Sequence, residues 1–179
     1  MSETNNNIIE SLCTRRSIRR YKPEQITDSE LQAVLNAGMY APTGMNRQDP
    51  WIVAVQNPSV LSRLTQMNAA IMGTTDNPYY DAPTVVLVFA SSPESWRNSI
   101  QDASLVLGNM MNAAHAIGLG SCWINREAEM FMTDEGKFMM KEFGLPDGLV
   151  GVGAISLGYP DGEPKSPKPR KEGYCRVIK

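Results

Sequence analysis

A long helical repeat of apolar residues constrains the fold of this chain more than any other feature of its sequence. Between about Ser95 and Gly118, apolar residues recur at spacings of three and four, which predicts a single long helix. The repeat consists of Ile100, Ala103, Val106, Leu107, Met110, Met111, Ala114 and Ile117. A stripe of small residues and methionines is more typical of a central packing helix, or of a helix at a dimer interface, than of a cofactor site.

Four apolar runs of strand length are separated by helical segments. Trp51–Val55 and Thr84–Phe89 have the β-branched bias of strands, and Ser121–Ile124 and Val150–Leu157 are two further short runs. The predicted order is helix, helix, strand, helix, strand, long helix, strand, helix, strand. This order predicts an α/β fold in which helices cover a sheet, as in a three-layer sandwich.

The remaining helices are predicted from periodicity and from capping signals. Helical patterns lie near residues 8–13, 31–38, 58–67 and 138–143. Thr27 and Glu30 have the spacing of a capping box, which predicts that the second helix begins there. Between Gly73 and Ala82 there is little periodicity, which predicts a mobile loop. We expect the mouth of a substrate site near this loop.

Composition restricts the class of protein. With 179 residues, 42% of them hydrophobic, the chain can bury one sizeable core, so residues 1–179 are expected to form a single domain. The net charge of −2 argues against nucleic-acid binding. The polar segment Met1–Asn7, and the lack of an apolar run of about 20 residues, predict a soluble, cytoplasmic protein without a membrane partner.

The chain has few residues of the types that carry hydrolytic or metal chemistry. Cys13, Cys122 and Cys175 show neither a disulfide framework nor the CxxC spacing of a metal site. The single histidine, His115, lies within the apolar pattern of the long helix, which favours a structural role. No metal site is predicted, and a bound cofactor is expected to supply the reactivity if the protein is an enzyme.

Two clusters of basic residues, at opposite ends of the chain, are candidates for binding one phosphate group. The first is Arg15, Arg16, Arg19 and Arg20 with Ser17 between them, and the second is Lys165, Lys168, Arg170 and Lys171. Guanidinium groups bind phosphate oxygens in bidentate fashion, and a serine hydroxyl adds a donor. The alternatives are a solvated surface and a nucleic-acid-binding patch. No GxxxxGK[ST] or strand-linked GxGxxG loop offers another phosphate site.

The second basic cluster belongs to a proline-rich tail, residues 160–179. Its four prolines alternate with basic residues, which forbids a helix and favours an extended chain. The apolar end of the tail, Tyr174–Ile178, is suited to adding an edge strand to a neighbouring chain. We therefore expect the tail to reach a partner protomer.

Three segments carry a more specific signal when they are read in order: Arg15–Tyr21, Ala41–Trp51 and Gly118–Ile124. Together they resemble the FMN-dependent nitroreductase family. The resemblance covers nearly the whole chain, since the family also has an apolar strand after an Ala-Pro pair, here Ala82-Pro83, a long central helix and a basic tail. It implies a central, mostly antiparallel sheet flanked by helices, and an intertwined homodimer.

The resemblance also assigns residues to a site for flavin mononucleotide (FMN). Residues 15–17 would hold the phosphate and the ribityl chain, and Lys168 and Arg170 would close on the same phosphate. Arg19 would reach the pyrimidine edge of the flavin, where a positive charge stabilises the reduced ring. A second phosphate contact is the alternative role for Arg19.

The second segment would complete the site from the other protomer. The resemblance places Pro42, Thr43, Gly44 and Asn46 of one protomer against a flavin ring bound mainly by the other, so the site would require a dimer. This chain departs from the commoner family pattern here. Gly44 lacks a hydroxyl that others have, and Asp49 is an additional residue.

The third segment would line the flavin's other face or edge with Cys122, Trp123 and Ile124. Asn125 stands where the family often has glycine, which would alter the hydrogen bonding at flavin N5. A plain core role is the alternative for Trp123, because aromatic side chains of short buried strands usually pack. A redox role for the Cys122 thiol is less favoured.

The implied reaction is a ping-pong hydride transfer. NADH or NADPH would reduce the flavin and leave, and a small electron-poor acceptor such as a nitroaromatic or a quinone would take its place. The protein would contribute positioning and electrostatics rather than a nucleophile. One alternative is another flavin reaction on the same scaffold, such as dehalogenation, dehydrogenation or flavin cleavage. Another is a sensor or storage protein that binds FMN without turnover.

Overall fold

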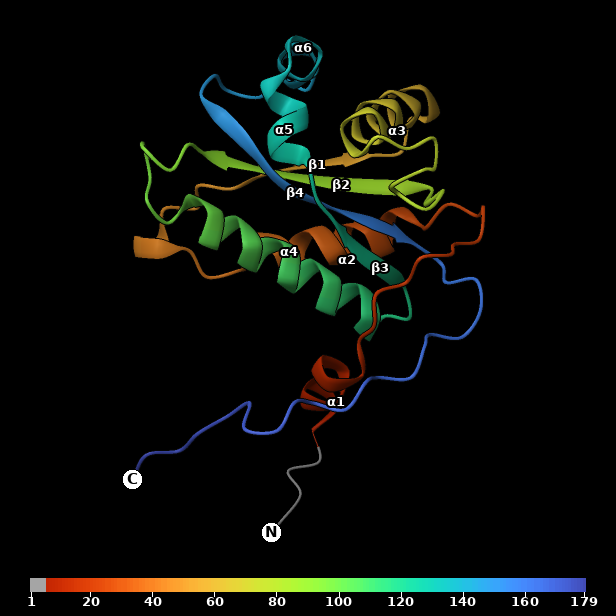
Figure 1. Ribbon diagram of the computed structural model, residues 1–179, viewed down its shortest axis with the longest axis vertical. Helices are drawn as coiled ribbons and strands as arrows, with labels where there is room; N and C mark the ends of the chain where they lie inside the picture. The colour runs from red at the N-terminus through yellow and green to blue at the C-terminus, as the bar shows by residue number, and fades with distance from the viewer. Residues whose placement is uncertain (1–5) are drawn as a thin grey trace.

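The computed structural model describes residues 6–179 and has a four-stranded sheet at its centre (Figure 1). The strands are β1 (Trp51–Val55), β2 (Thr84–Ser91), β3 (Gly120–Ile124) and β4 (Leu149–Gly158). Their order in the sheet is β1-β2-β4-β3, and every neighbouring pair is antiparallel. The antiparallel sheet implied by the family resemblance is therefore confirmed.

Helices cover both faces of the sheet and complete three layers (Figure 1). One face carries α2 (Asp28–Met39) and α4 (Ser99–Ala116), with α1 (Asn7–Thr14) beside α4. The opposite face carries α3 (Pro58–Met72), α5 (Glu127–Met132) and α6 (Asp134–Glu142). A short 3-10 turn, η1 (Gly44–Asn46), lies between α2 and β1. Thr27 caps α2 with the expected capping box.

The central strand β2 explains why both faces need helices. Val86, Val88 and Ala90 belong to the core beneath α2 and α4, whereas Leu87 and Phe89 belong to the core beneath α3, α5 and α6. Successive side chains of a strand point to opposite faces, so a strand buried on both sides is apolar without interruption.

The long helix α4 is the central packing helix that its pattern predicted. Ala103, Val106, Leu107, Met110 and Ala114 are buried against the sheet and α2. The helix begins at Ser99 rather than near Ser95, because residues 92–98 form turns instead.

The helical stretch after β3 is two helices rather than one. The α5 helix ends at Met132, and the Thr133 hydroxyl accepts a hydrogen bond from the Gly136 backbone N–H (3.0 Å), which caps the new helix α6. A Cβ at Gly136 would overlap the carbonyl oxygen of Met130. The sequence interpretation missed this break, because Thr133 and Gly136 are compatible with a continuous helix in periodicity alone.

The segment 73–82, which was expected to be a mobile loop, packs into the core in its second half. Tyr79 is 2% exposed, and its carbonyl oxygen accepts a hydrogen bond from the Ser156 hydroxyl (2.9 Å). Pro78 and Ala82 are also buried. The expectation was wrong for this half, because a turn-rich sequence gave no indication that the ring of Tyr79 fills an interior position.

The tail has the extended form that its prolines predict. Residues 161–179 contain no helix or strand, and all of them are exposed. In Figure 1 the blue tail runs past α1 before it ends. Within residues 6–179, no helix is both long enough and apolar enough to cross a membrane.

Candidate functional site

The arginine segment that follows α1 lies between the edge strand β3 and the start of the tail. The Ile18 backbone N–H donates to the Ser121 carbonyl oxygen (3.0 Å), and the Asp161 N–H donates to the Arg20 carbonyl oxygen (3.0 Å). Gly120 makes the close approach possible, because a Cβ there would come within 2.9 Å of the Ile18 side chain. These contacts bring the two ends of the chain together.

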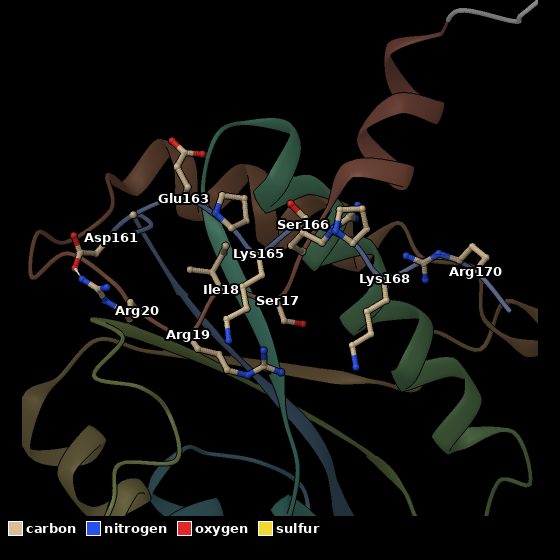
Figure 2. A pocket seen from close by; sticks show the side chains of 14 residues that line it. Ser17, Ile18, Arg19, Arg20, Asp161, Glu163, Lys165, Ser166, Lys168 and Arg170 are labelled. Carbon is tan, nitrogen blue, oxygen red and sulfur yellow. Dashed lines mark hydrogen bonds and ion pairs between the residues drawn. The ribbon is translucent and has the colours of Figure 1, made fainter.

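Residues of both basic clusters line one cleft of about 610 Å³ between the arginine segment and the tail (Figure 2). Pockets of about 300–1,000 Å³ are typical of small-molecule sites. The cleft carries four net positive charges, from six basic and two acidic side chains. These are Arg16, Arg19, Arg20, Lys165, Lys168 and Arg170, with Asp161 and Glu163.

The lining side chains do not all point the same way (Figure 2). Ser17, Arg19, Lys165 and Lys168 are directed into the cleft. Arg20 turns aside to form an ion pair with Asp161 (2.7 Å). Arg170 lies apart from the others, at one end of the cleft. The family resemblance assigned only Lys168 and Arg170 of the tail to the phosphate and left out Lys165, because spacing in an extended tail does not tell which lysines face inward.

Arg15 and Arg16 differ in what their guanidinium groups contact. Arg16 Nη1 donates to the carbonyl oxygens of Cys13 (2.9 Å) and Arg15 (2.7 Å), so it caps the end of α1. Arg15 is not among the residues that line the cleft. Its Nη1 atom is buried and has no hydrogen-bond partner in the described part of the chain. An unpaired buried donor is costly, so Arg15 retains an unused capacity to bind an anion.

Strand β3 presents its side chains to both faces of the sheet. Cys122 and Ile124 are 2% and 4% exposed in the core beneath α3 and α5. Trp123 is partly buried on the α4 side, and its Nε1 donates to Asn125 Oδ1 (2.7 Å). Of the three predicted ring contacts, Trp123 is therefore the side chain best placed to meet a ligand. Burial raises the pKa of the Cys122 thiol despite the charge of Arg19, which disfavours a reactive thiolate.

Residues 42–46 lie near the opposite end of α4 from the arginine segment. The Gly44 N–H donates to Asp102 Oδ1 (2.9 Å) in the first turn of α4. His115, in the last turn, contacts the Thr14 hydroxyl (2.9 Å), next to the arginines. The 18 residues of α4 extend over ~27 Å at ~1.5 Å per residue. A single chain therefore does not bring Pro42, Thr43, Gly44 and Asn46 to the cleft.

His115 makes a structural contact, as the sequence indicated. The Thr14 hydroxyl donates its one hydrogen bond to the Glu10 carbonyl oxygen (2.8 Å). It therefore acts as the acceptor toward His115, whose Nε2 is the donor. Burial, together with the charges of the nearby arginines, lowers the pKa of His115 and favours this neutral form. Among residues 6–179, no three His, Cys, Asp or Glu side chains come together as metal ligands.

Two of the three departures from the family pattern, Gly44 and Asp49, are explained by their local contacts. A Cβ at Gly44 would come within 2.8 Å of the Trp96 ring and 2.9 Å of the Asn98 amide, so the position leaves little room for a side chain. The Asp49 carboxylate accepts hydrogen bonds from the Ser91 N–H (3.0 Å) and hydroxyl (2.6 Å). The additional residue thus joins the start of β1 to the end of β2.

Restoring a side chain at Gly44 is expected to cost stability. Gly44→Ser and Gly44→Ala should each lower the free energy of unfolding by about 1–2 kcal/mol, because Trp96 must move aside in both. Urea unfolding measures the change. Equal losses in the two variants identify the Cβ as the cause. A serine variant as stable as the parent would show that the space around Gly44 is not limiting.

The model of the Nitroreductase family matches residues 12–159. The chain belongs to this family. The sequence-based resemblance to the nitroreductases is therefore confirmed.

Individual relatives of this nitroreductase-family chain match it over most of its length. An Archaeoglobus fulgidus protein with the provisional name NADH dehydrogenase/NAD(P)H nitroreductase is 30% identical over 87% of this chain and 86% of its own. The NADPH-flavin oxidoreductase of Vibrio harveyi is 26% identical over 96% of this chain and 73% of its own. The FMN-bound nitroreductase structure from Bacteroides fragilis superposes with a TM-score of 0.88 at 30% identity, covering 98% and 100% of the two chains.

Proposed function

We propose that this nitroreductase-family chain is an FMN-dependent oxidoreductase that transfers hydride from NADH or NADPH to a small electron-poor acceptor. The observation that carries the proposal is the meeting of basic residues from both ends of the chain in one cleft with four net positive charges. The relatives support it, since they include an FMN-bound nitroreductase and an NADPH-flavin oxidoreductase.

The residues of the cleft fit the phosphate end of FMN. A phosphate monoester carries nearly two negative charges at neutral pH and offers three acceptor oxygens. Ser17, Lys165 and Lys168 point into the cleft. Arg15 does not line the cleft, but it precedes the cleft-lining Arg16, and its buried Nη1 donor has no partner within residues 6–179. Arg170 at the end of the cleft would add a further charge. Several charged donors would thus face the three phosphate oxygens, and charge-assisted hydrogen bonds of this kind are the stronger ones.

The chain's own residues would bind and orient the cofactor, which supplies the hydride chemistry when bound. Arg19 stays protonated, as guanidinium groups do in proteins at any ordinary pH, and it would place a positive charge beside the flavin ring. Trp123 would pack against an edge of the ring. Positioning and charge are therefore the main contributions of the protein.

A homodimer would complete the site. Residues 42–46 are too far along α4 to reach the cleft of their own chain, so we assign them to the flavin site of the partner subunit. The exposed apolar end of the tail, including Val177 and Ile178, is assigned to contact with that subunit. One cleft shared by nucleotide and acceptor favours a ping-pong order.

Steady-state kinetics of the FMN-loaded protein tests this function. Oxidation of NADPH or NADH should depend on an added nitroaromatic or quinone, and double-reciprocal plots at several acceptor concentrations should be parallel. Intersecting lines would contradict the shared cleft. FMN that binds but is never reduced would favour the sensor or storage alternative, and reduced FMN that passes hydride to neither acceptor would favour another flavin reaction.

A further inference from the structure

A buried polar cluster lies behind the end of β3, on the face of the sheet covered by α3 and α5. The cluster consists of Asn68 on α3, Glu127 on α5, and Tyr79 in the segment before β2. Each of these residues is at most 2% exposed. The Tyr79 hydroxyl donates to Glu127 Oε1 (3.2 Å). Asn68 Nδ2 lies within hydrogen-bond distance of the Tyr79 hydroxyl (3.4 Å) and donates to the Asn125 carbonyl oxygen (3.0 Å). A buried carboxyl is thereby linked to the residue that follows β3.

Two acceptors of this cluster lack donors. Glu127 Oε2 and Asn68 Oδ1 are buried, and neither has a hydrogen-bond partner within residues 6–179. An ionised carboxylate with so few donors is costly in the interior, whereas a protonated carboxyl gains a donor of its own. The surroundings of Glu127 therefore favour its protonated form more than water does.

The groups around Glu127 agree with that conclusion. Burial raises the pKa of Glu127 to about 7, although its own backbone, the Tyr79 hydroxyl and the charge of Arg126 act to lower it, and Glu129 acts to raise it. Helix α3 contributes only the neutral Asn68 amide to the hydrogen-bonded cluster. Strand β4 approaches with Gly151, where a Cβ would overlap the Glu127 carbonyl oxygen.

The other side of the link is the segment that ends β3. Asn125 Oδ1 accepts the hydrogen bond from Trp123 Nε1 (2.7 Å). The next residue, Arg126, has a φ of 84°, a left-handed conformation that a non-glycine residue adopts only when tertiary contacts hold it. The bond from Asn68 to the Asn125 carbonyl is such a contact. Asn125 therefore links Asn68 to the Trp123 indole, so a movement of the Asn68 side chain can shift the indole.

We propose that Glu127 is a positioning residue that acts through Tyr79 and Asn68 to hold Asn125 and the Trp123 indole in place, and that gain or loss of its proton shifts them. An ionised carboxylate draws the Tyr79 hydroxyl more strongly than a neutral one, because charge-assisted hydrogen bonds are shorter. The relevance to catalysis rests on the proposed function, in which Trp123 packs against the flavin. The linked chain itself is independent of FMN.

Tryptophan fluorescence of FMN-free protein tests the link directly. Between pH 5 and pH 9, the emission of the parent is expected to change in one transition with a midpoint near pH 7. The transition should be lost in Glu127→Gln, which keeps the shape but cannot ionise, and in Tyr79→Phe, which breaks the link. It should also be lost in Trp123→Phe, while Trp51 and Trp96 still emit. Persistence of the transition in Glu127→Gln would overturn the proposal.

A second readout separates this inference from the proposed function. In FMN-loaded protein, the rate of flavin reduction by NADPH should depend on pH near 7 in the parent and lose that step in Glu127→Gln. If FMN is reduced normally and both pH transitions survive the substitution, the positioning role is wrong and the oxidoreductase function stands. If the fluorescence transition is lost as expected but the protein binds no FMN, the link stands and the proposed function falls.

Discussion

Arg15→Ala is expected to weaken FMN binding by about 10- to 150-fold. The substitution removes a charged donor whose Nη1 is buried and unpaired within the described residues. The loss of one charged hydrogen bond costs about 1.5–3 kcal/mol, and each ~1.4 kcal/mol is a factor of ten in affinity. Quenching of flavin fluorescence on titration with the apoprotein measures the dissociation constant. Arg170→Ala should give a smaller loss, because its side chain is exposed.

Arg20→Ala is the matched control for the phosphate assignment. Arg20 also lines the cleft, but its guanidinium is engaged with Asp161 at 2.7 Å and is 76% exposed. Exposed ion pairs contribute little, so FMN affinity should change by no more than about twofold. Unchanged affinity in Arg15→Ala, or a larger loss in Arg20→Ala than in Arg15→Ala, would show that the phosphate binds elsewhere.

Glu127→Gln is expected to raise the free energy of unfolding by about 3 kcal/mol at pH 8 and by little at pH 4.5. Burial raises the pKa of Glu127 to about 7 in the folded protein, against an ordinary value of 4.5 for a solvated glutamate. Because the folded pKa is the higher one, the favourable contribution of the protonated carboxyl is complete below about pH 4.5 and is lost as the pH rises through 7. A difference of ~2.5 pKa units corresponds to about 3 kcal/mol.

Urea unfolding of the parent and of Glu127→Gln at pH 4.5, 6 and 8 measures the difference in their free energies of unfolding. The difference in stability between variant and parent should widen steadily as the pH rises. Glu129→Gln is the control, since Glu129 lies on the same helix but is exposed, and its substitution should give a small difference that does not grow with pH. A gap for Glu127→Gln of the same size at pH 4.5 and pH 8 would show that its carboxyl does not titrate abnormally.

The layers of the fold were largely predictable, because burial leaves a clear pattern in sequence. The first strand, Trp51–Val55, was predicted at its observed bounds. The uninterrupted apolar run that becomes β2 indicated a strand covered on both sides. The antiparallel pairing followed from the family resemblance, since alternation does not set strand direction. The division between α5 and α6 was missed, because Thr133 can cap a helix or continue one.

The basic residues of the site could be predicted, because they are clustered in the sequence. The buried carboxyl of Glu127 could not, because its properties depend on burial in the folded protein. The arginine segment and the basic tail were expected to meet, and they line one cleft. Glu127 gave no signal, because a glutamate among polar neighbours is usually solvated. Its burial depends on Tyr79 and Asn68, which are distant in the sequence and come together only when α3 and α5 pack on the same face.

The most direct test of the central claim is an absorbance spectrum of the purified protein, reconstituted with FMN and freed of excess cofactor, before and after adding NADPH or NADH without air. We predict flavin bands between about 300 and 550 nm that stay with the protein and bleach when the nucleotide is added, because the cofactor supplies the hydride chemistry. Bound flavin that fails to bleach with either nucleotide would contradict the reductase function. Protein that retains no flavin at all would contradict the assignment of the basic cleft to FMN.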